Sequence, residues 1–192
     1  MNYKKRAFTL IELLVGITII GIISLGVAKL YGSNIPDKQK LDLFTNKIIG
    51  IIDSVKNYAL VGKGIGTNLE TPKYFKIELS TGGLSAGTFT GSYLKTYYNT
   101  GSTYESYDEM SINSFNEFYN IHSIKCKKID DLTDSLDATN GKVDIIFEGS
   151  NTTLSGCTNN YYKIVDIELY YKSFRKVIRL NALSGVIEEI KN

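Results

Sequence analysis

Side chains that commonly carry out chemistry are scarce in this chain. It has one histidine, His122, and two cysteines, Cys126 and Cys157, among 192 residues. These three side chains cannot supply a four-ligand zinc site, so no metal and no cofactor is predicted. The sequence contains neither a phosphate-binding G-x-x-x-x-G-K-[ST] loop nor an H-E-x-x-H pair. We therefore predict that the chain is not an enzyme and that His122 is an ordinary strand or loop residue.

A group of acidic residues lies near position 130. The apolar residues Ile129, Leu132 and Leu136 follow helical spacing and predict a short helix with an acidic outer face that ends at Asn140-Gly141. The aspartates are Asp130, Asp131, Asp134 and Asp137. Their spacing does not match an EF-hand loop, so we interpret them as a solvated face, with a Ca²⁺ site as the alternative.

Composition places the chain among ordinary globular proteins. Hydrophobic residues make up 43% and charged residues 22% of the sequence. These values exclude a mainly disordered chain, a collagen and a polytopic membrane protein. The formal net charge is only +2, so nucleic acid is not indicated as a partner.

The apolar residues are concentrated at the N-terminus. From Phe8 to Ala28 the only charged side chain is Glu12. As a helix this run would be about 31 Å long, which is enough to span a bilayer. The basic residues before it, at positions 4–6, predict a cytoplasmic N-terminus and an extracytoplasmic remainder. An ordinary signal sequence cut after Ala28 is the alternative.

Glu12 needs an explanation of its own. An ionised carboxylate within the membrane costs about 2.5–3.5 kcal/mol, even on the lenient insertion scale. A plain anchor or signal sequence has no use for this charge. Its presence therefore indicates a function with a cationic partner.

The segment Arg6-Ala-Phe-Thr-Leu-Ile-Glu-Leu-Leu14 resembles the processing site of type IV prepilins and type II secretion pseudopilins. The resemblance extends over residues 1 to about 60. It implies that a prepilin peptidase cuts between Ala7 and Phe8 and methylates the new amine. Glu12 would then be the fifth residue of the mature chain, which in this family pairs with the N-terminal amine of a neighbouring subunit. The family usually has Gly where this chain has Ala7.

The resemblance also implies a domain layout, a location and partners. Residues 1–7 would be the leader, 8–36 a transmembrane and assembly helix, 37–62 an amphipathic half-helix, and 63–192 the globular head. The protein would be anchored once in the cytoplasmic membrane before joining an extracellular filament. Its partners would be the peptidase, the pilus assembly machinery and other pilin subunits. A minor pilin is favoured over a major pilin, and a pseudopilin of secretion or DNA uptake is the alternative.

Periodicity beyond the apolar run predicts the elements of the head. Pro36 disfavours helical geometry at Ile35, so a break is expected there. Apolar residues then recur at helical spacing until the glycines at 62–66 stop the helix. Alternating strands are predicted at 74–79, 142–148 and 162–170, with a closing hairpin of 177–180 and 186–190. We predict an α+β protein of the pilin fold, with an antiparallel sheet wrapped on the helix.

Residues 80–107 are rich in Ser, Thr, Gly and Tyr. Tyrosine combined with Ser and Gly is typical of binding loops, because it offers a large contact area at a low cost in entropy. The candidates for surface recognition are Tyr93, Tyr97, Tyr98, Tyr104 and Tyr107. An ordinary polar segment, holding either a hairpin or a surface loop with half-buried tyrosines, is the alternative.

Cys126 and Cys157 would lie in the extracytoplasmic part. An oxidising compartment favours a disulfide between them, and many pilins carry one disulfide in this part of the head. Two free thiols are the alternative state.

Overall fold

The computed structural model describes residues 11, 14–20, 35–65, 69–85, 88–101, 103–113, 115, 118–158 and 161–190. For 83–85 and 88–90 only the backbone is described. The chain divides into two compact units, residues 1–36 and 37–192. Among its described residues the second unit contains helix α2 (Asp37–Val61) and twelve strands.

Helix α2 forms because one of its faces is apolar and can be buried. Leu41, Phe44, Ile48, Ile52 and Val55 recur three or four residues apart and are all buried. The helix ends at Val61, where Gly62 adopts a positive φ of 63°. The amide of Lys63 then donates to the carbonyl of Tyr58 at 3.0 Å, which is the glycine-capped helix end predicted from the sequence.

Two five-stranded antiparallel sheets and a small ribbon make up the rest of the head. The first sheet has the order β5-β4-β1-β8-β9, and its strands are β1 (Tyr74–Ser80), β4 (Tyr93–Asn99), β5 (Glu105–Ser106), β8 (Lys142–Glu148) and β9 (Asn151–Ser155). The second has the order β12-β11-β10-β6-β7, with β6 (Tyr119–Lys128), β7 (Ser135–Asp137), β10 (Tyr162–Tyr171), β11 (Phe174–Asn181) and β12 (Val186–Ile190). The ribbon pairs β2 (Gly83–Ser85) with β3 (Thr88–Thr90).

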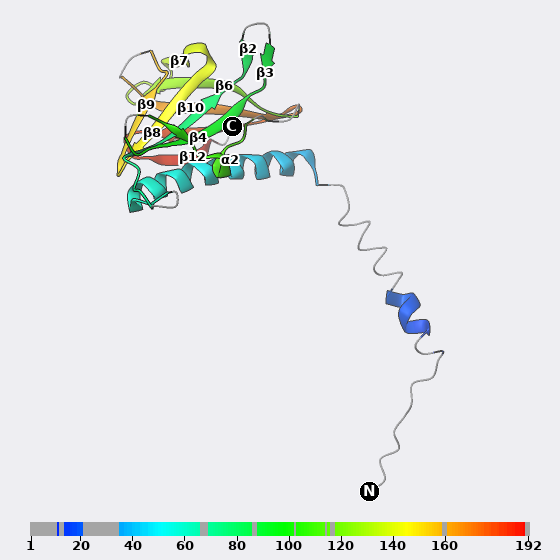
Figure 1. Ribbon diagram of the computed structural model, residues 1–192. Helices are drawn as coiled ribbons and strands as arrows, with labels where there is room; N and C mark the ends of the chain where they lie inside the picture. The colour runs from blue at the N-terminus through cyan, green and yellow to red at the C-terminus, as the bar shows by residue number, and fades with distance from the viewer. Residues whose placement is uncertain are drawn as a thin grey trace. The chain divides into compact units, whose positions relative to one another are not determined.

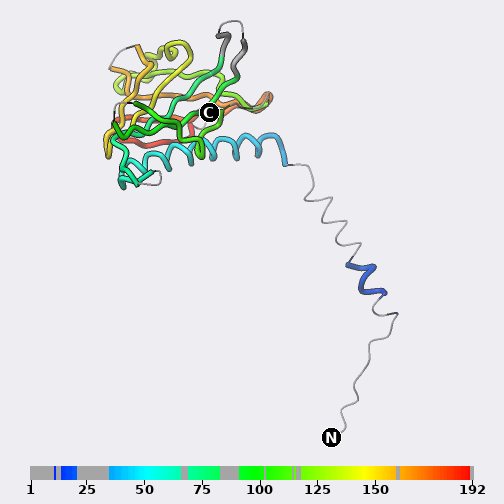
Figure 2. The backbone as a smooth tube through the Cα atoms, in the orientation of Figure 1, coloured from blue at the N-terminus to red at the C-terminus, as the bar shows by residue number. Residues whose placement is uncertain are grey.

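The chain alternates between the two sheets. It builds β1, β4 and β5 in the first, β6 and β7 in the second, β8 and β9 in the first again, and then β10 to β12 in the second, a path that can be followed in Figure 2. Figure 1 shows α2 lying along one side of these strands. Two short 3₁₀ turns, η1 (Asp108–Met110) and η2 (Thr139–Gly141), complete the head.

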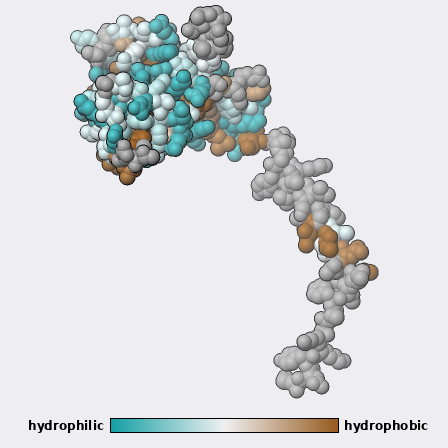
Figure 3. Space-filling view, in the orientation of Figure 1, coloured by the Kyte–Doolittle hydropathy of each residue, from teal (hydrophilic) through white to brown (hydrophobic). Residues whose placement is uncertain are grey.

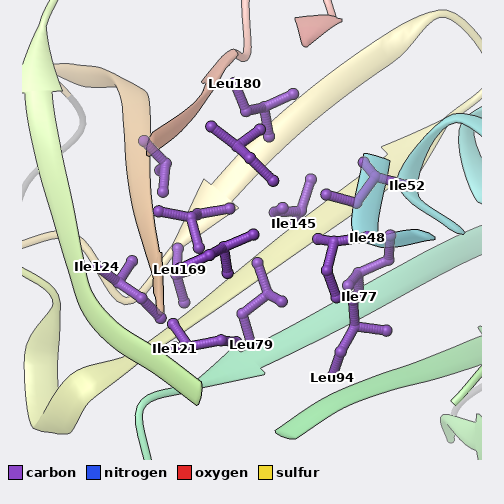
Figure 4. Packing of buried hydrophobic residues seen from close by; sticks show 14 of the residues in the cluster. Ile48, Ile52, Ile77, Leu79, Leu94, Ile121, Ile124, Ile145, Leu169 and Leu180 are labelled. Atoms are coloured by element: carbon purple, nitrogen blue, oxygen red, sulfur yellow. The ribbon is translucent and has the colours of Figure 1, made fainter. Parts of the chain in front are cut away.

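One hydrophobic core joins α2 to both sheets. Figure 4 shows Ile48 and Ile52 of α2 close to the side chains of the strands. The first sheet contributes Ile77, Leu79, Leu94 and Ile145, and the second contributes Ile121, Ile124, Leu169 and Leu180. The structure therefore confirms an α+β class with a helix packed on antiparallel strands.

The prediction of a single sheet was wrong. Alternation in a strand indicates which face is buried, but it does not identify the neighbouring strand. Each predicted strand exists, and β8 has the predicted bounds, but they are divided between two sheets. Residues 80–107, for which a hairpin or a surface loop was predicted, contain the β2–β3 pair and also β4 and β5 of the first sheet.

The predicted short helix near position 130 was also wrong. Residues 132–133 form a turn, and residues 135–137 form β7, which pairs with β6. The oxygen Oδ1 of Asp131 accepts from the amide of Thr133 at 3.0 Å and from its hydroxyl at 2.5 Å. This side-chain bonding stabilises a turn in place of a helix, as is common for Asp.

Candidate functional site

The residues of the predicted processing and assembly site, Ala7, Phe8 and Glu12, lie outside the described residues. Residues 14–20 are helical, and the hydroxyl of Thr18 donates to the carbonyl of Val15 at 2.8 Å. Ile17, Ile19 and Ile20 are more than half exposed. Among the residues that the structure describes, no helix is both long and apolar enough to cross a membrane.

The five predicted tyrosines separate into two groups on opposite faces of the first sheet. Side chains alternate along β4, so buried Leu94 and Thr96 face the core, and Tyr93 and Tyr97 face outward. Tyr104 lies with the outward group. Tyr98 and Tyr107 lie together near the end of α2.

The outward group surrounds the amine of Lys76, which we call the Lys76 cluster (Lys76, Glu78, Tyr93, Tyr97, Tyr104, Lys142 and Asp144). The Lys76 Nζ atom lies 4.5 Å from the ring centroid of Tyr97 and 5.0 Å from that of Tyr104. It also lies 3.5 Å from an oxygen of Asp144 and 3.6 Å from an oxygen of Glu78. Three strands, β1, β4 and β8, therefore bring rings and opposite charges together on a solvent-facing surface.

The environment of the Lys76 cluster shifts the pKa values of its two carboxyl groups in opposite directions. Burial raises the pKa of Asp144, and the attraction of Lys76 only partly opposes this. Burial also acts to raise the pKa of Glu78, but the hydrogen bond from Tyr93 and the charges of Lys142 and Lys76 outweigh it, so this pKa is lowered. The Tyr93 hydroxyl donates to Glu78 at 2.6 Å, and the pKa of Tyr93 is raised by burial and by this bond.

The second group of tyrosines holds the end of α2. The Lys63 Nζ atom lies 3.7 Å from the ring centroid of Tyr58 and 3.4 Å from the hydroxyl oxygen of Tyr107. The ring of Tyr107 packs edge-on against that of Tyr98, with centroids 6.3 Å apart. Tyr98 and Tyr107 thus have a structural use at the end of α2, whereas Tyr93, Tyr97 and Tyr104 belong to the Lys76 cluster.

Cys126 and Cys157 are joined by a disulfide, with their Cα atoms 5.9 Å apart. Cys126 lies in β6 of the second sheet, and Cys157 follows β9 of the first. The bond therefore links the two sheets covalently.

Sequence reasoning missed a charged groove on the outer face of the second sheet. Its cavity of about 350 Å³ is lined by side chains of β6, β10, β11 and β12. Asp166 accepts from the Arg179 guanidinium through both oxygens, at 2.7 and 2.8 Å, and lies 3.0 Å from the Lys127 amine. The sequence does carry acids at 166 and 168 in β10 and bases at 175, 176 and 179 in β11, but only the register places Asp166 opposite Arg179.

Residues 83–87 read G-x-S-x-G, the pattern of a nucleophile elbow. An elbow requires a strand followed by a helix, whereas this segment runs from β2 toward β3 of a ribbon. His122 lies in β6 with its ring centroid 4.6 Å from that of Tyr170. Within the described ranges no group of three His, Cys, Asp or Glu residues could hold a metal ion.

Comparison with known families gives one result. Residues 2–28 match the model of the prokaryotic N-terminal methylation motif, which is the prepilin-type signal of type IV pilins and pseudopilins. Comparisons with curated proteins and with solved structures gave no match.

Proposed function

We propose that the chain is a structural subunit of a type IV pilus-like filament and, within that class, a minor pilin. The observation that carries this proposal is the methylation motif at residues 2–28. The motif supports cleavage by a prepilin peptidase between Ala7 and Phe8 and assembly with other pilin subunits. The minor role is favoured by Ala7 before the cut and by the twelve strands described in the head.

Assembly proceeds through the N-terminal helix. After cleavage the new amine of Phe8 carries a positive charge, and Glu12 of an adjacent subunit attracts it. The pair sets the register between subunits, and each charge compensates the other as both leave the aqueous interface. The amine is the cationic partner that a carboxylate in an apolar run requires.

The head supplies the outer surface of the filament. In this proposal the Lys76 cluster is the recognition surface, with Tyr93, Tyr97 and Tyr104 as its aromatic residues. Tyr104 is 41% exposed, which leaves part of its ring accessible. The proposal assigns no catalytic activity, cofactor or nucleic-acid partner to the chain.

Counting subunits in filaments tests this function. Filaments sheared from the cell surface would be purified and this chain quantified against the most abundant subunit. We expect the chain to be present at low copy. Its absence from filaments, together with loss of protein secretion or DNA uptake when its gene is deleted, would favour a pseudopilin. Equal abundance would identify a major pilin.

A further inference from the structure

An open apolar groove lies beside the first turns of α2. Leu43 and Phe44 of the helix line it together with Ile112, Phe115 and Tyr119, and its volume is about 420 Å³. Leu43 is 56% exposed, Phe44 is buried, and Ile112, Phe115 and Tyr119 are half-buried. We call this feature the α2 groove.

Basic side chains border the α2 groove. Lys40 and Lys47 are among its lining residues, and Lys47 is exposed. Asp37 pairs with Lys40 at 3.5 Å and with Lys172 at 2.9 Å, and Asp42 pairs with Lys176 at 2.7 Å. The exposed Lys47 therefore supplies the positive charge at the edge of the groove. The groove is therefore apolar in its centre and positive at its edge.

The opposite end of α2 carries an apolar projection, which we call the α2 knob (Leu60, Val61 and Leu69). Val61 is 75% exposed and Leu69 is 73% exposed. The groove and the knob are separated by about four to five helical turns, or roughly 25 Å. Figure 3 shows hydrophobic surface at the end of the head where α2 finishes.

An exposed acidic residue, Glu70, directly follows Leu69 of the α2 knob. Glu70, Glu105 and Glu109 are exposed, and two of them accept hydrogen bonds from the tyrosines at this end of the helix. The cation of the same region, Lys63, is held against the ring of Tyr58. The knob thus has a negative edge, opposite in sign to the edge of the groove.

The backbone presents Leu69 at an energetic cost. Leu69 has a φ of 52°, a left-handed conformation that is uncommon for residues other than glycine. The amide of Ile65 donates to the carbonyl of Glu70 at 2.9 Å, and Gly64 lies so close to Leu69 that a Cβ atom would come within 2.6 Å of the Leu69 carbonyl oxygen. Strained backbone of this kind clusters at functional sites, so it motivates a search for a function of Leu69.

We propose that the α2 knob of one copy docks in the α2 groove of a second copy of this chain. Apolar surface meets apolar surface, and Glu70 of one copy faces Lys47 of the next. Because the two surfaces differ and lie at opposite ends of α2, the contact is head-to-tail, and each copy has one surface free to bind a further copy. The inference rests on the proposed function, because assembly into a filament is what would bring copies of the chain side by side. It predicts that this subunit occurs in short contiguous runs within the filament.

Cysteine cross-linking of the full chain in its own cells tests the contact. The variant combines Leu43→Cys and Leu69→Cys, which replace exposed side chains and leave the Cys126–Cys157 disulfide in place. After mild oxidation, membranes and sheared filaments are compared on non-reducing gels. We expect a ladder of dimers, trimers and longer species, because every copy carries both halves of the contact.

Matched controls separate this contact from chance collisions. Each single variant should give no multimers, and neither should Leu69→Cys with Leu183→Cys, which moves the partner cysteine to another exposed leucine. Lys47→Glu or Glu70→Lys, added to the cross-linking variant, should each lower the ladder yield about two- to fivefold, and the two together should restore it.

The outcomes distinguish this inference from the proposed function. Absence of a ladder in every fraction, with both cysteines reactive toward a maleimide, would overturn the docking contact even if the chain is found in filaments. Dimers from Leu69→Cys alone, or cross-links to a different protein alone, would overturn it as well. A ladder in membranes without any chain in filaments would support the contact and contradict the filament role.

Discussion

At the scale of single residues, Glu12 has the most specific role in the proposed assembly. A charge-assisted contact between its carboxylate and the Phe8 amine of a neighbour contributes about 1.5–3 kcal/mol. Glu12→Ala should therefore lower incorporation into filaments by roughly ten- to a hundredfold, while cleavage between Ala7 and Phe8 continues. Quantification of the cleaved chain in membrane and filament fractions measures both steps. Incorporation of the variant at the wild-type level would remove Glu12 from the mechanism.

Asp166 gives a prediction for stability against pH. Burial acts to raise its pKa, but hydrogen bonds from Arg179 and Lys127 outweigh burial, so its pKa in the folded protein is lowered. The stability it contributes is present above the unfolded pKa of about 3.9 and is lost as the pH falls through the folded pKa. Asp166→Asn should cost about 1.5–3 kcal/mol at pH 7 and progressively less on acidification. Urea unfolding at a series of pH values measures this.

Asp144 is a control for the Asp166 prediction, because its pKa is shifted in the opposite direction. Its pKa is raised in the folded protein, mainly by burial, so the folded state gains stability relative to the unfolded state as this group is protonated. The difference between wild type and Asp144→Asn should therefore change with falling pH in the direction opposite to that for Asp166→Asn. If the stability difference from wild type changed with pH in the same direction for both variants, the assignment of these two environments would be contradicted.

At the scale of elements, α2 is the part that unites the head. Ile52 is fully buried among side chains of the core, so Ile52→Ala should destabilise the head by about 2–5 kcal/mol. The neighbouring Asp53 is exposed, and Asp53→Ala should change stability by no more than about 0.5 kcal/mol. Denaturant unfolding compares the two. Similar losses for both variants would contradict the packing of α2.

The disulfide gives a second prediction at this scale. It closes a loop with a sequence separation of 31 residues and connects the two sheets. Replacing both cysteines with alanine should lower the free energy of unfolding by roughly 3–4 kcal/mol in the chain-entropy model. Unfolding of the double variant and of the reduced wild-type protein measures the loss. Unchanged stability in both would contradict a structural role for the bond.

Elements with regular patterns were predictable from the sequence. Residues 142–148 alternate cleanly and form β8, and the glycines after Val61 end α2 as expected. Strand β6 was not identified, because its register with β10 shifts near His122 and the shift interrupts the alternation of its side chains. Pairing between distant strands, which creates two sheets and places Asp166 beside Arg179, is not encoded in any local pattern.

For the molecule as a whole, sequence and structure contribute different parts of the account. The short motif around Ala7, Phe8 and Glu12 predicts how the chain is processed and assembled, and those residues lie outside the described part. The structure shows the head, in which the predicted tyrosines divide between a group around Lys76 and a group at the end of α2. A division of this kind depends on strand register, and composition alone treats all five tyrosines alike.

The central claim is that this chain is processed as a prepilin. Mass spectrometry of the N-terminal peptide of the mature protein, isolated from the cell surface, tests it most directly. We predict a peptide that begins at Phe8 and carries a methylated amine. A mature chain that begins at Lys29, as an ordinary signal sequence cut after Ala28 would give, or one that retains Met1, would contradict the account.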